Sequence, residues 1–306
     1  MTLLRTGVGS LPHQDVFDAV DFVIATSDIP YLPQLPRRHP QESMLVQWGD
    51  GMLGAGPRDA GLTVGVAPGT RAEAFVGAAA VLARIEGDTV KTQVTGPVTL
   101  AAALLAGGVS GGPSLIGSVA EQLEVRIDEH LAWIRDESDV SRIILMIDEP
   151  ALAALGSTDR LPGEAARALI DMIEAFDVEV GLHCCGDTDW GAVAQLGFDW
   201  LSWDVAALAG GFYEGIDAIA AALGAGTRVM WGIVPTTTGP LPDTNVLLGR
   251  YGTVVASLVV AGAPYEALAS RALFTPACGL AGMSVNNAEA VADALRLVVE
   301  EVESGW

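Results

Sequence analysis

The stretch Glu179–Asp204, EVGLHCCGDTDWGAVAQLGFDWLSWD, begins and ends with a short hydrophobic run of β-strand character. Residues that can carry chemistry end both runs: His183 and Cys185 at the first, and Asp204 at the second. Short buried strands that alternate with longer helical patterns are typical of a parallel sheet. This stretch therefore predicts an α/β fold with reactive side chains at its strand ends.

The same alternation extends over most of the chain. The eight predicted strands are Leu3–Val8, Pro30–Leu35, Thr89–Val94, Arg142–Ile147, Glu179–His183, Trp200–Trp203, Arg228–Val234 and Ala272–Thr275. The predicted helices between them include Arg71–Glu86, Leu115–Glu137, Gly163–Ala175, Asn245–Ala261 and Asn287–Glu303. Eight strand–helix pairs predict a closed (β/α)8 TIM barrel, and an open doubly wound sheet is the alternative.

Length and composition agree with one catalytic domain over residues 1–306. A chain of 306 residues suits a single α/β barrel, and its 50% hydrophobic content allows a large core. No change of composition and no linker rich in Pro, Gly or Ser divides the chain. We therefore expect a single domain.

The charge of the chain limits its partners and its location. A formal net charge of -22 repels phosphate backbones and anionic lipids, which argues against nucleic acid or membrane partners. The N-terminus lacks the features of a signal peptide, and the longest apolar stretches are shorter than the ~20 residues that cross a bilayer. We expect a cytoplasmic protein, in which three cysteines are metal ligands or core residues rather than disulfides.

Polar residues gather where the predicted strands end. They are Gly9-Ser10, Asp148-Glu149, His183-Cys184-Cys185, Asp204 and Cys278. In a barrel, the rim formed by the C-terminal strand ends carries the active site. The positions of these residues therefore predict one site at that rim.

His183, Cys185 and Cys278 form a candidate metal site. Side chains two apart on a strand share one face, so His183 and Cys185 converge while Cys184 points the other way. Cys278 follows the last predicted strand, and closure of the barrel would bring it close to them. One imidazole and two thiolates suit Zn²⁺ and leave a fourth position for substrate. The alternative for each cysteine is a small buried hydrophobe.

Two carboxylates near this site have open roles. Asp204 is either a fourth, exchangeable zinc ligand or a carboxylate that supports the ligands or caps the next turn. Glu149 is either a rim residue that orients substrate or a charge at a helix N-terminus.

Five segments together resemble the C-terminal catalytic barrel of cobalamin-independent methionine synthases, relatives of uroporphyrinogen decarboxylase. The matching segments are Gly9-Ser10-Leu11-Pro12, Gln93-Val94-Thr95-Gly96-Pro97-Val98-Thr99, Ile147-Asp148-Glu149-Pro150-Ala151-Leu152, His183-Cys184-Cys185 and Pro276-Ala277-Cys278-Gly279-Leu280. An additional N-terminal barrel of the full-length enzymes has no counterpart, so the chain resembles the single-barrel "core" forms.

This resemblance implies roles for individual residues. It makes His183, Cys185 and Cys278 the zinc ligands, and it puts Asp204 where the family has a Glu ligand. Gly9 and Ser10 match the loop that binds the backbone groups of the amino acid. Asp148 matches a carboxylate for the substrate ammonium, and Gln47 stands in the region expected to hold a second one.

The resemblance also implies the reaction. It is a zinc-dependent transfer of a methyl group to a thiol, most simply homocysteine to give methionine in amino-acid biosynthesis. The family's folate-stacking Trp, a Glu after Asp148-Glu149-Pro150 and a proton-donating His have no counterparts here. These departures favour a methylcorrinoid, such as methylcobalamin or a corrinoid protein, over methyltetrahydrofolate as donor.

Three alternative functions stay open. The acceptor could be a different, coenzyme-type thiol, which Gln47 favours. The chain could be a zinc- or corrinoid-binding protein without catalysis. A decarboxylase like that for uroporphyrinogen fits poorly, because it needs basic side chains for substrate carboxylates and no metal.

Overall fold

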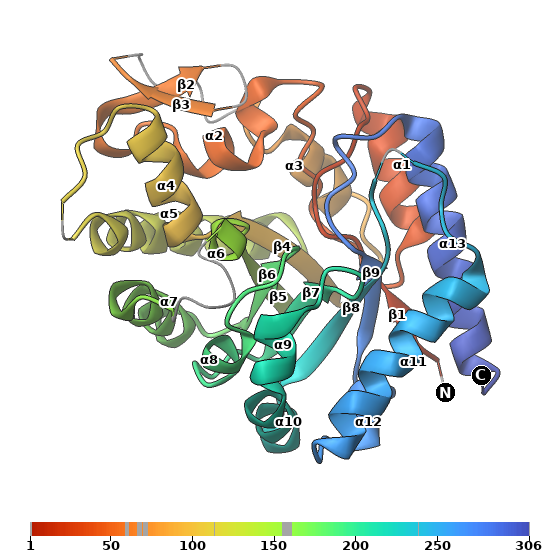
Figure 1. Cartoon of the computed structure of the whole chain (residues 1–306). Coiled ribbons are helices and arrows are strands. Elements are labelled where there is room, and N and C mark those ends of the chain that lie inside the picture. The colour runs from red at the N-terminus through yellow and green to blue at the C-terminus, as the bar shows by residue number, and fades with distance from the viewer. Residues whose placement is uncertain are drawn as a thin grey trace.

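The computed structural model describes residues 2–58, 61–65, 69, 73–112, 114–154, 161–237 and 239–305. Its centre is a parallel sheet of seven strands in the order β1-β9-β8-β7-β6-β5-β4, which curls around an interior (Figure 1). The strands are β1 (Leu4–Arg5), β4 (Thr89–Thr95), β5 (Arg142–Asp148), β6 (Glu179–Cys184), β7 (Trp200–Asp204), β8 (Arg228–Val234) and β9 (Leu273–Pro276). The predicted α/β class and parallel sheet are therefore confirmed.

The prediction of a fully closed eight-stranded barrel is wrong for the described residues. The segment 30–35, predicted as a strand, joins its neighbours only through isolated bridges, Tyr31 to Lys91 and Ser10 to Gln34. Pro30 and Pro33 lie within this segment. Because proline has no backbone N–H, a continuous ladder cannot form there.

Strand β5 shows why the sheet is buried on both faces. Ile143, Leu145 and Ile147 belong to the main hydrophobic core, whereas Ile144 and Met146 belong to a second cluster. The second cluster also contains Ile29, Trp200, Met230 and Leu273. It fills the interior of the curled sheet with apolar side chains, and the polar strand ends lie beyond it.

Helices surround the sheet on its outer side (Figure 1). They are α1 (Val16–Thr26), α2 (Met44–Gly49), α3 (Val76–Leu82), α4 (Pro97–Ala106), α5 (Leu115–Glu137), α6 (Ala151–Ala154), α7 (Gly163–Ala175), α8 (Trp190–Ala194), α9 (Gly210–Glu214), α10 (Ile216–Ala225), α11 (Thr244–Val260), α12 (Tyr265–Leu268) and α13 (Val285–Glu303). Two 3-10 turns, Pro40–Glu42 and Met52–Gly54, lead to an antiparallel hairpin of β2 (Ala55–Arg58) and β3 (Gly61–Val64).

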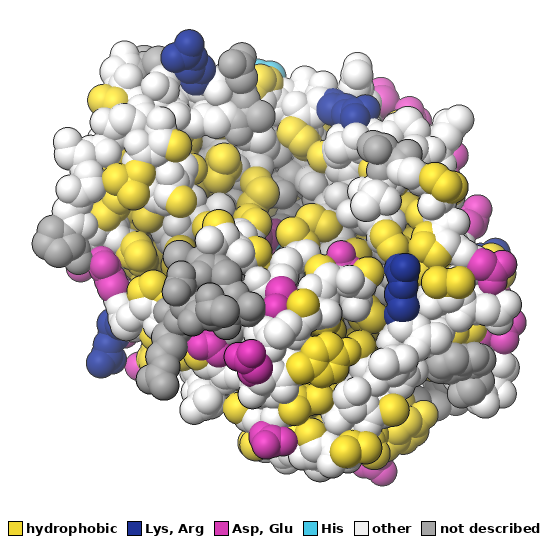
Figure 2. All heavy atoms as spheres, viewed as in Figure 1, with side chains coloured by type: hydrophobic (Ala, Val, Ile, Leu, Met, Phe, Trp, Pro, Cys, Tyr) yellow, Lys and Arg dark blue, Asp and Glu magenta, His cyan; other side chains and the backbone are white. Residues whose placement is uncertain are grey.

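The long predicted helices agree well with the structure. Helices α5 and α7 have the predicted bounds, whereas α3 is shorter than the predicted Arg71–Glu86, whose first two residues lie outside the described part of the chain. The hairpin β2–β3 was not predicted. None of the described helices has the length and apolarity that crossing a membrane requires. Lys and Arg side chains are sparse on the face in Figure 2, in keeping with the negative charge.

Candidate metal centre

The structure brings His183, Cys185 and Cys278 together. Each offers one ligand atom, and these atoms all lie within 4.8 Å of one another. His183 and Cys185 come from the end of β6, and Cys278 follows β9. In the sheet, β7 and β8 separate these two strands, so the curl of the sheet makes the approach possible. Among the described residues, this is the group whose spacing could hold a metal ion.

His183 is oriented by the neighbouring strand. Its Nδ1 lies 2.9 Å from Ser202 Oγ, and Ser202 faces it in the β6–β7 register. The imidazole is buried, and its Nε2 has no hydrogen-bond partner. With Nδ1–H donating to Ser202, Nε2 keeps its lone pair for a metal ion.

The two thiols differ in acidity. A hydrogen bond from the Cys278 thiol, and then the nearby His183 imidazole, hold the pKa of Cys185 below its usual value. The same hydrogen bond raises the pKa of Cys278, and burial of its thiol raises it further. Cys184 is fully buried in the hydrophobic core and faces away from them, as the alternation along β6 predicts.

Asp148 lies next to His183 in the β5–β6 register. Its carboxylate is buried, and Oδ1 has no hydrogen-bond partner. Burial raises its pKa to about 6, against the lowering effects of His183 and Lys91. An unpartnered carboxylate oxygen in such a place favours a cationic or N–H-bearing ligand.

Asp204 lies outside the group of three ligands. Its Oδ1 accepts a hydrogen bond of 2.8 Å from the backbone N–H of Ala206, so it caps the turn after β7. It is near enough for the charges of Cys185 and His183 to affect its pKa, which burial raises. Asp204 therefore caps a turn beside the centre, and its role as a fourth zinc ligand stays a prediction.

The Gly9–Ser10 loop reaches the segment that carries Cys278. The backbone N–H of Leu280 donates to Ser10 O over 2.7 Å. Ser10 Oγ lies directly over Gly279, where a side chain would collide with it. This close approach places the loop beside Cys278.

Gln47 and Glu149 are engaged elsewhere. Gln47 accepts from Gln34 Nε2 over 2.7 Å and donates to the backbone oxygen of Ala74, so its amide is occupied. Both Glu149 oxygens accept from the first turn of α4: the Val98 N–H, the Thr99 N–H and the Thr99 hydroxyl, at 2.6–2.8 Å. Glu149 is thus the N-terminal charge of a helix, but of α4 rather than of the helix beside Pro150.

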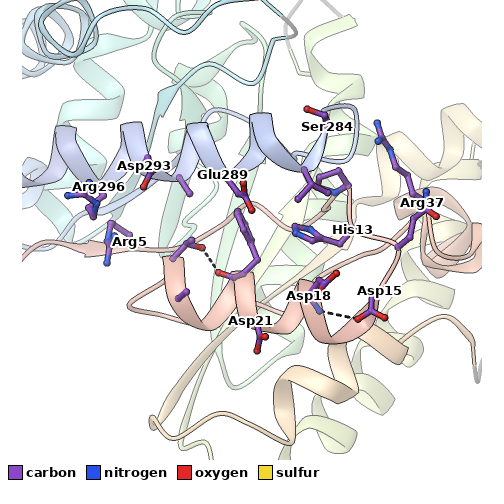
Figure 3. Close-up of a pocket in the computed structure, with 17 residues that line it drawn as sticks. Arg5, His13, Asp15, Asp18, Asp21, Arg37, Ser284, Glu289, Asp293 and Arg296 are labelled. Carbon is purple, nitrogen blue, oxygen red and sulfur yellow. Dashed lines mark hydrogen bonds between the residues drawn. The ribbon is translucent and has the colours of Figure 1, made fainter.

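A wide surface groove lies between α1 and α13, and Figure 3 shows His13 between the two helices. Several of its charges already have partners: Arg5 with Asp28, Asp21 with Arg84, and Arg296 with Glu300. No ligand of the metal group lines it. The candidate site is therefore the centre at His183 and not this groove.

Two residues of the site were not singled out from the sequence: Ser202 and Lys91. Lys91, Asp148, His183 and Ser202 line a small enclosed space inside the sheet. The alternation of side chains along a strand could have indicated them. Lys91 and Gln93 share the inward face of β4, and Ser202 precedes Asp204 by two residues on β7.

Comparisons with known proteins agree with this fold. No protein-family model matches the chain, and no curated protein matches its sequence. Among solved structures, it is similar to a B12-independent methionine synthase from Shewanella sp. W3-18-1 in complex with selenomethionine. The TM-score is 0.64 and the identity 14%, over 99% of this chain and 98% of the other. The expected methylcorrinoid donor finds no support here, since that synthase is independent of B12. The chain shares the fold of that synthase across almost its whole length.

Proposed function

We propose that this protein is a zinc-dependent methyltransferase that acts on a thiol, with homocysteine as acceptor and methionine as product. One catalytic domain over residues 1–306 would carry the reaction. The observation that carries this proposal is the convergence of His183, Cys185 and Cys278, whose ligand atoms lie within 4.8 Å of one another.

The residues present suit zinc. One imidazole nitrogen and two sulfurs are preferred zinc ligands, and three protein ligands leave a position open for a substrate. The buried Nε2 of His183 lacks a partner, as expected of an atom kept for a metal. Zinc bound there would lower the pKa of an acceptor thiol, so that it reacts as the thiolate.

The surroundings of the centre suit an amino acid. The Oδ1 of Asp148 has no hydrogen-bond partner and would accept from an α-ammonium group, and the Gly9–Ser10 loop lies beside the segment that carries Cys278. The similar methionine synthase was solved with selenomethionine, an amino acid of the product's shape. In the reaction, the acceptor sulfur forms a bond to the methyl carbon, and the donor keeps the electron pair of the bond that breaks.

A second candidate is transfer to a thiol without an amino group. It is favoured by Gln47, which stands where a second carboxylate is expected and whose amide is already occupied by Gln34 and Ala74.

The proposal is tested by zinc analysis and by methyl transfer. We expect about one zinc per chain in the wild type and in Cys184→Ala, and little zinc in Cys185→Ser. Purified zinc protein should methylate homocysteine from methyltetrahydrofolate or another small methyl donor, and Cys185→Ser should not. Zinc-free wild-type protein, or zinc protein inactive with every donor and thiol, would contradict the proposal.

A further inference from the structure

The curled sheet has a seam between β1 and β4. Backbone pairing across it is limited to the segment 30–35, through the bridges Tyr31 to Lys91 and Ser10 to Gln34. The Gly9–Ser10 loop lies four residues beyond the end of β1 at Arg5, on the β1 side of this seam. A few backbone bonds, to Gln34 and to Leu280, hold this loop, and side chains of β4 add further contacts.

Lys91 spans the seam from the β4 side. Its Nζ donates to Val8 O over 2.7 Å, and Gln93 Oε1 lies 3.4 Å from it. The side chain is only 2% exposed, and burial lowers its pKa to about 8, although the charge of Asp148 opposes this effect. A buried ammonium group is costly unless it forms hydrogen bonds, so the bond to Val8 is a strong constraint on the residue before Gly9.

Gln93, two residues further along β4, completes the contact. Its Nε2 donates to Leu32 O over 2.7 Å. Its side chain also packs against Gly9, where an added Cβ would lie 2.6 Å from Gln93 Cδ. The side chain therefore holds the segment 30–35 on one side and supports the loop on the other.

We propose that Lys91 and Gln93 are positioning residues, which clamp the Gly9–Ser10 loop beside Cys278 and so set the binding of the acceptor thiol. The inference rests on the proposed function. The clamp supplements the interrupted backbone pairing of segment 30–35, which is limited to two isolated bridges.

The clamp differs from ordinary packing. The rest of the interior of the curled sheet is filled by apolar side chains such as Ile144 and Met146. Filling this interior therefore does not require an ammonium group such as that of Lys91. On the opposite face of β4, Thr92 makes a buried hydrogen bond of 2.9 Å to His130 of α5. Thr92→Val is therefore a matched control, because it also removes one buried hydrogen bond from the same strand.

The test compares Lys91→Met, Gln93→Met and Thr92→Val in the full-length zinc protein. In the first two variants we expect the KM for the acceptor thiol to rise about ten-fold, with kcat within about two-fold and zinc content unchanged. Hydrogen exchange should become faster at two amides of the loop contact. The Leu11 amide donates to Gln34 O, and the Gln34 amide donates to Gly9 O. Thr92→Val should leave KM and these amides unchanged.

Unchanged exchange at Leu11 and Gln34 in both variants would overturn the clamp, as would an unchanged KM or an equal rise of KM in Thr92→Val. If Lys91→Met does not fold, Gln93→Met tests the same contact with a milder change. If the wild type transfers no methyl group, the proposed function fails, and the exchange rates still decide whether the clamp exists.

Discussion

At the residue scale, the centre depends on how His183 is held. A histidine ligand needs its second nitrogen fixed so that the first points at the metal with its lone pair available. In the proposed zinc site Ser202 Oγ would perform this task, since it lies 2.9 Å from Nδ1 and both residues are buried on adjacent strands.

Ser202→Ala should weaken zinc binding about 10- to 100-fold, because the imidazole loses the group that orients it. Competition with a chromophoric chelator measures the change. Ser202→Thr keeps the hydroxyl and serves as the control, with an affinity close to that of the wild type. Equal zinc affinity of Ser202→Ala and wild type would show that Ser202 does not orient the ligand.

A substitution at Asp148 distinguishes the two candidate acceptors, homocysteine and a thiol without an amino group. Asp148→Asn removes the negative charge with little change of shape. The KM for homocysteine should rise about ten-fold or more, because a buried hydrogen bond between charged groups is lost. Zinc content should stay constant, and a thiol without an amino group should react as with the wild type. If homocysteine is unaffected, Asp148 does not hold its ammonium group.

At the element scale, the amino ends of four strands are tied together by Glu179 of β6. Its carboxylate accepts from Arg142 of β5 at 2.9 Å, from Trp200 of β7 at 2.8 Å, and pairs with Arg228 of β8 at 2.8 Å. The Arg228 guanidinium also lies over the Trp200 ring. This cluster lies at the opposite end of β6 from His183, so it supports the sheet without touching the centre.

Glu179→Gln should lower the free energy of unfolding by roughly 1–3 kcal/mol near neutral pH, with zinc content unchanged. Chemical denaturation measures the loss. Glu300→Gln, which breaks the exposed pair with Arg296, is the control and should cost little. A loss no larger than that of Glu300→Gln would contradict this role of Glu179.

The same carboxylate predicts a pH dependence. Burial alone would raise its pKa, but hydrogen bonds from Arg142 and Trp200 and the charge of Arg228 lower it from 4.5 to about 2. Because the folded state favours the ionised form, the stabilisation is present above pH 4.5 and is lost as the pH falls toward 2. The stability difference between wild type and Glu179→Gln should therefore shrink over this range. A constant difference would exclude this linkage.

At the scale of the whole molecule, a metal at this centre would join segments far apart in the chain. His183 and Cys185 end β6, whereas Cys278 follows β9, and β7 and β8 lie between them in the sheet. A bound ion stabilises the folded state by its binding free energy, since the unfolded chain holds no preformed site.

Removal of zinc by a chelator should lower the Tm of the wild type, and added zinc should restore it, because binding favours the folded chain. Differential scanning calorimetry measures both steps. The Tm of Cys185→Ser should respond to neither addition. A wild-type Tm that is insensitive to the chelator would argue against a metal that bridges these strands.

The sequence predicted much of this molecule. Alternating hydrophobic runs located the strands from β4 to β9, and amphipathic periodicity located α5 and α7 at their observed bounds. The pair His183 and Cys185 could be placed on one face because side chains on a strand alternate. The opposed orientation of Cys184 followed from the same rule.

The tertiary structure decided the contacts between segments that lie far apart in the sequence. Glu149 caps α4, a helix that begins 52 residues earlier at Pro97, and Gln47 is occupied by Gln34 and Ala74. Lys91 bonds to Val8 across the seam left by the prolines of segment 30–35. Local patterns reflect the period of a strand or helix, whereas these contacts depend on how the sheet curls, and the curl is a property of all its strands together.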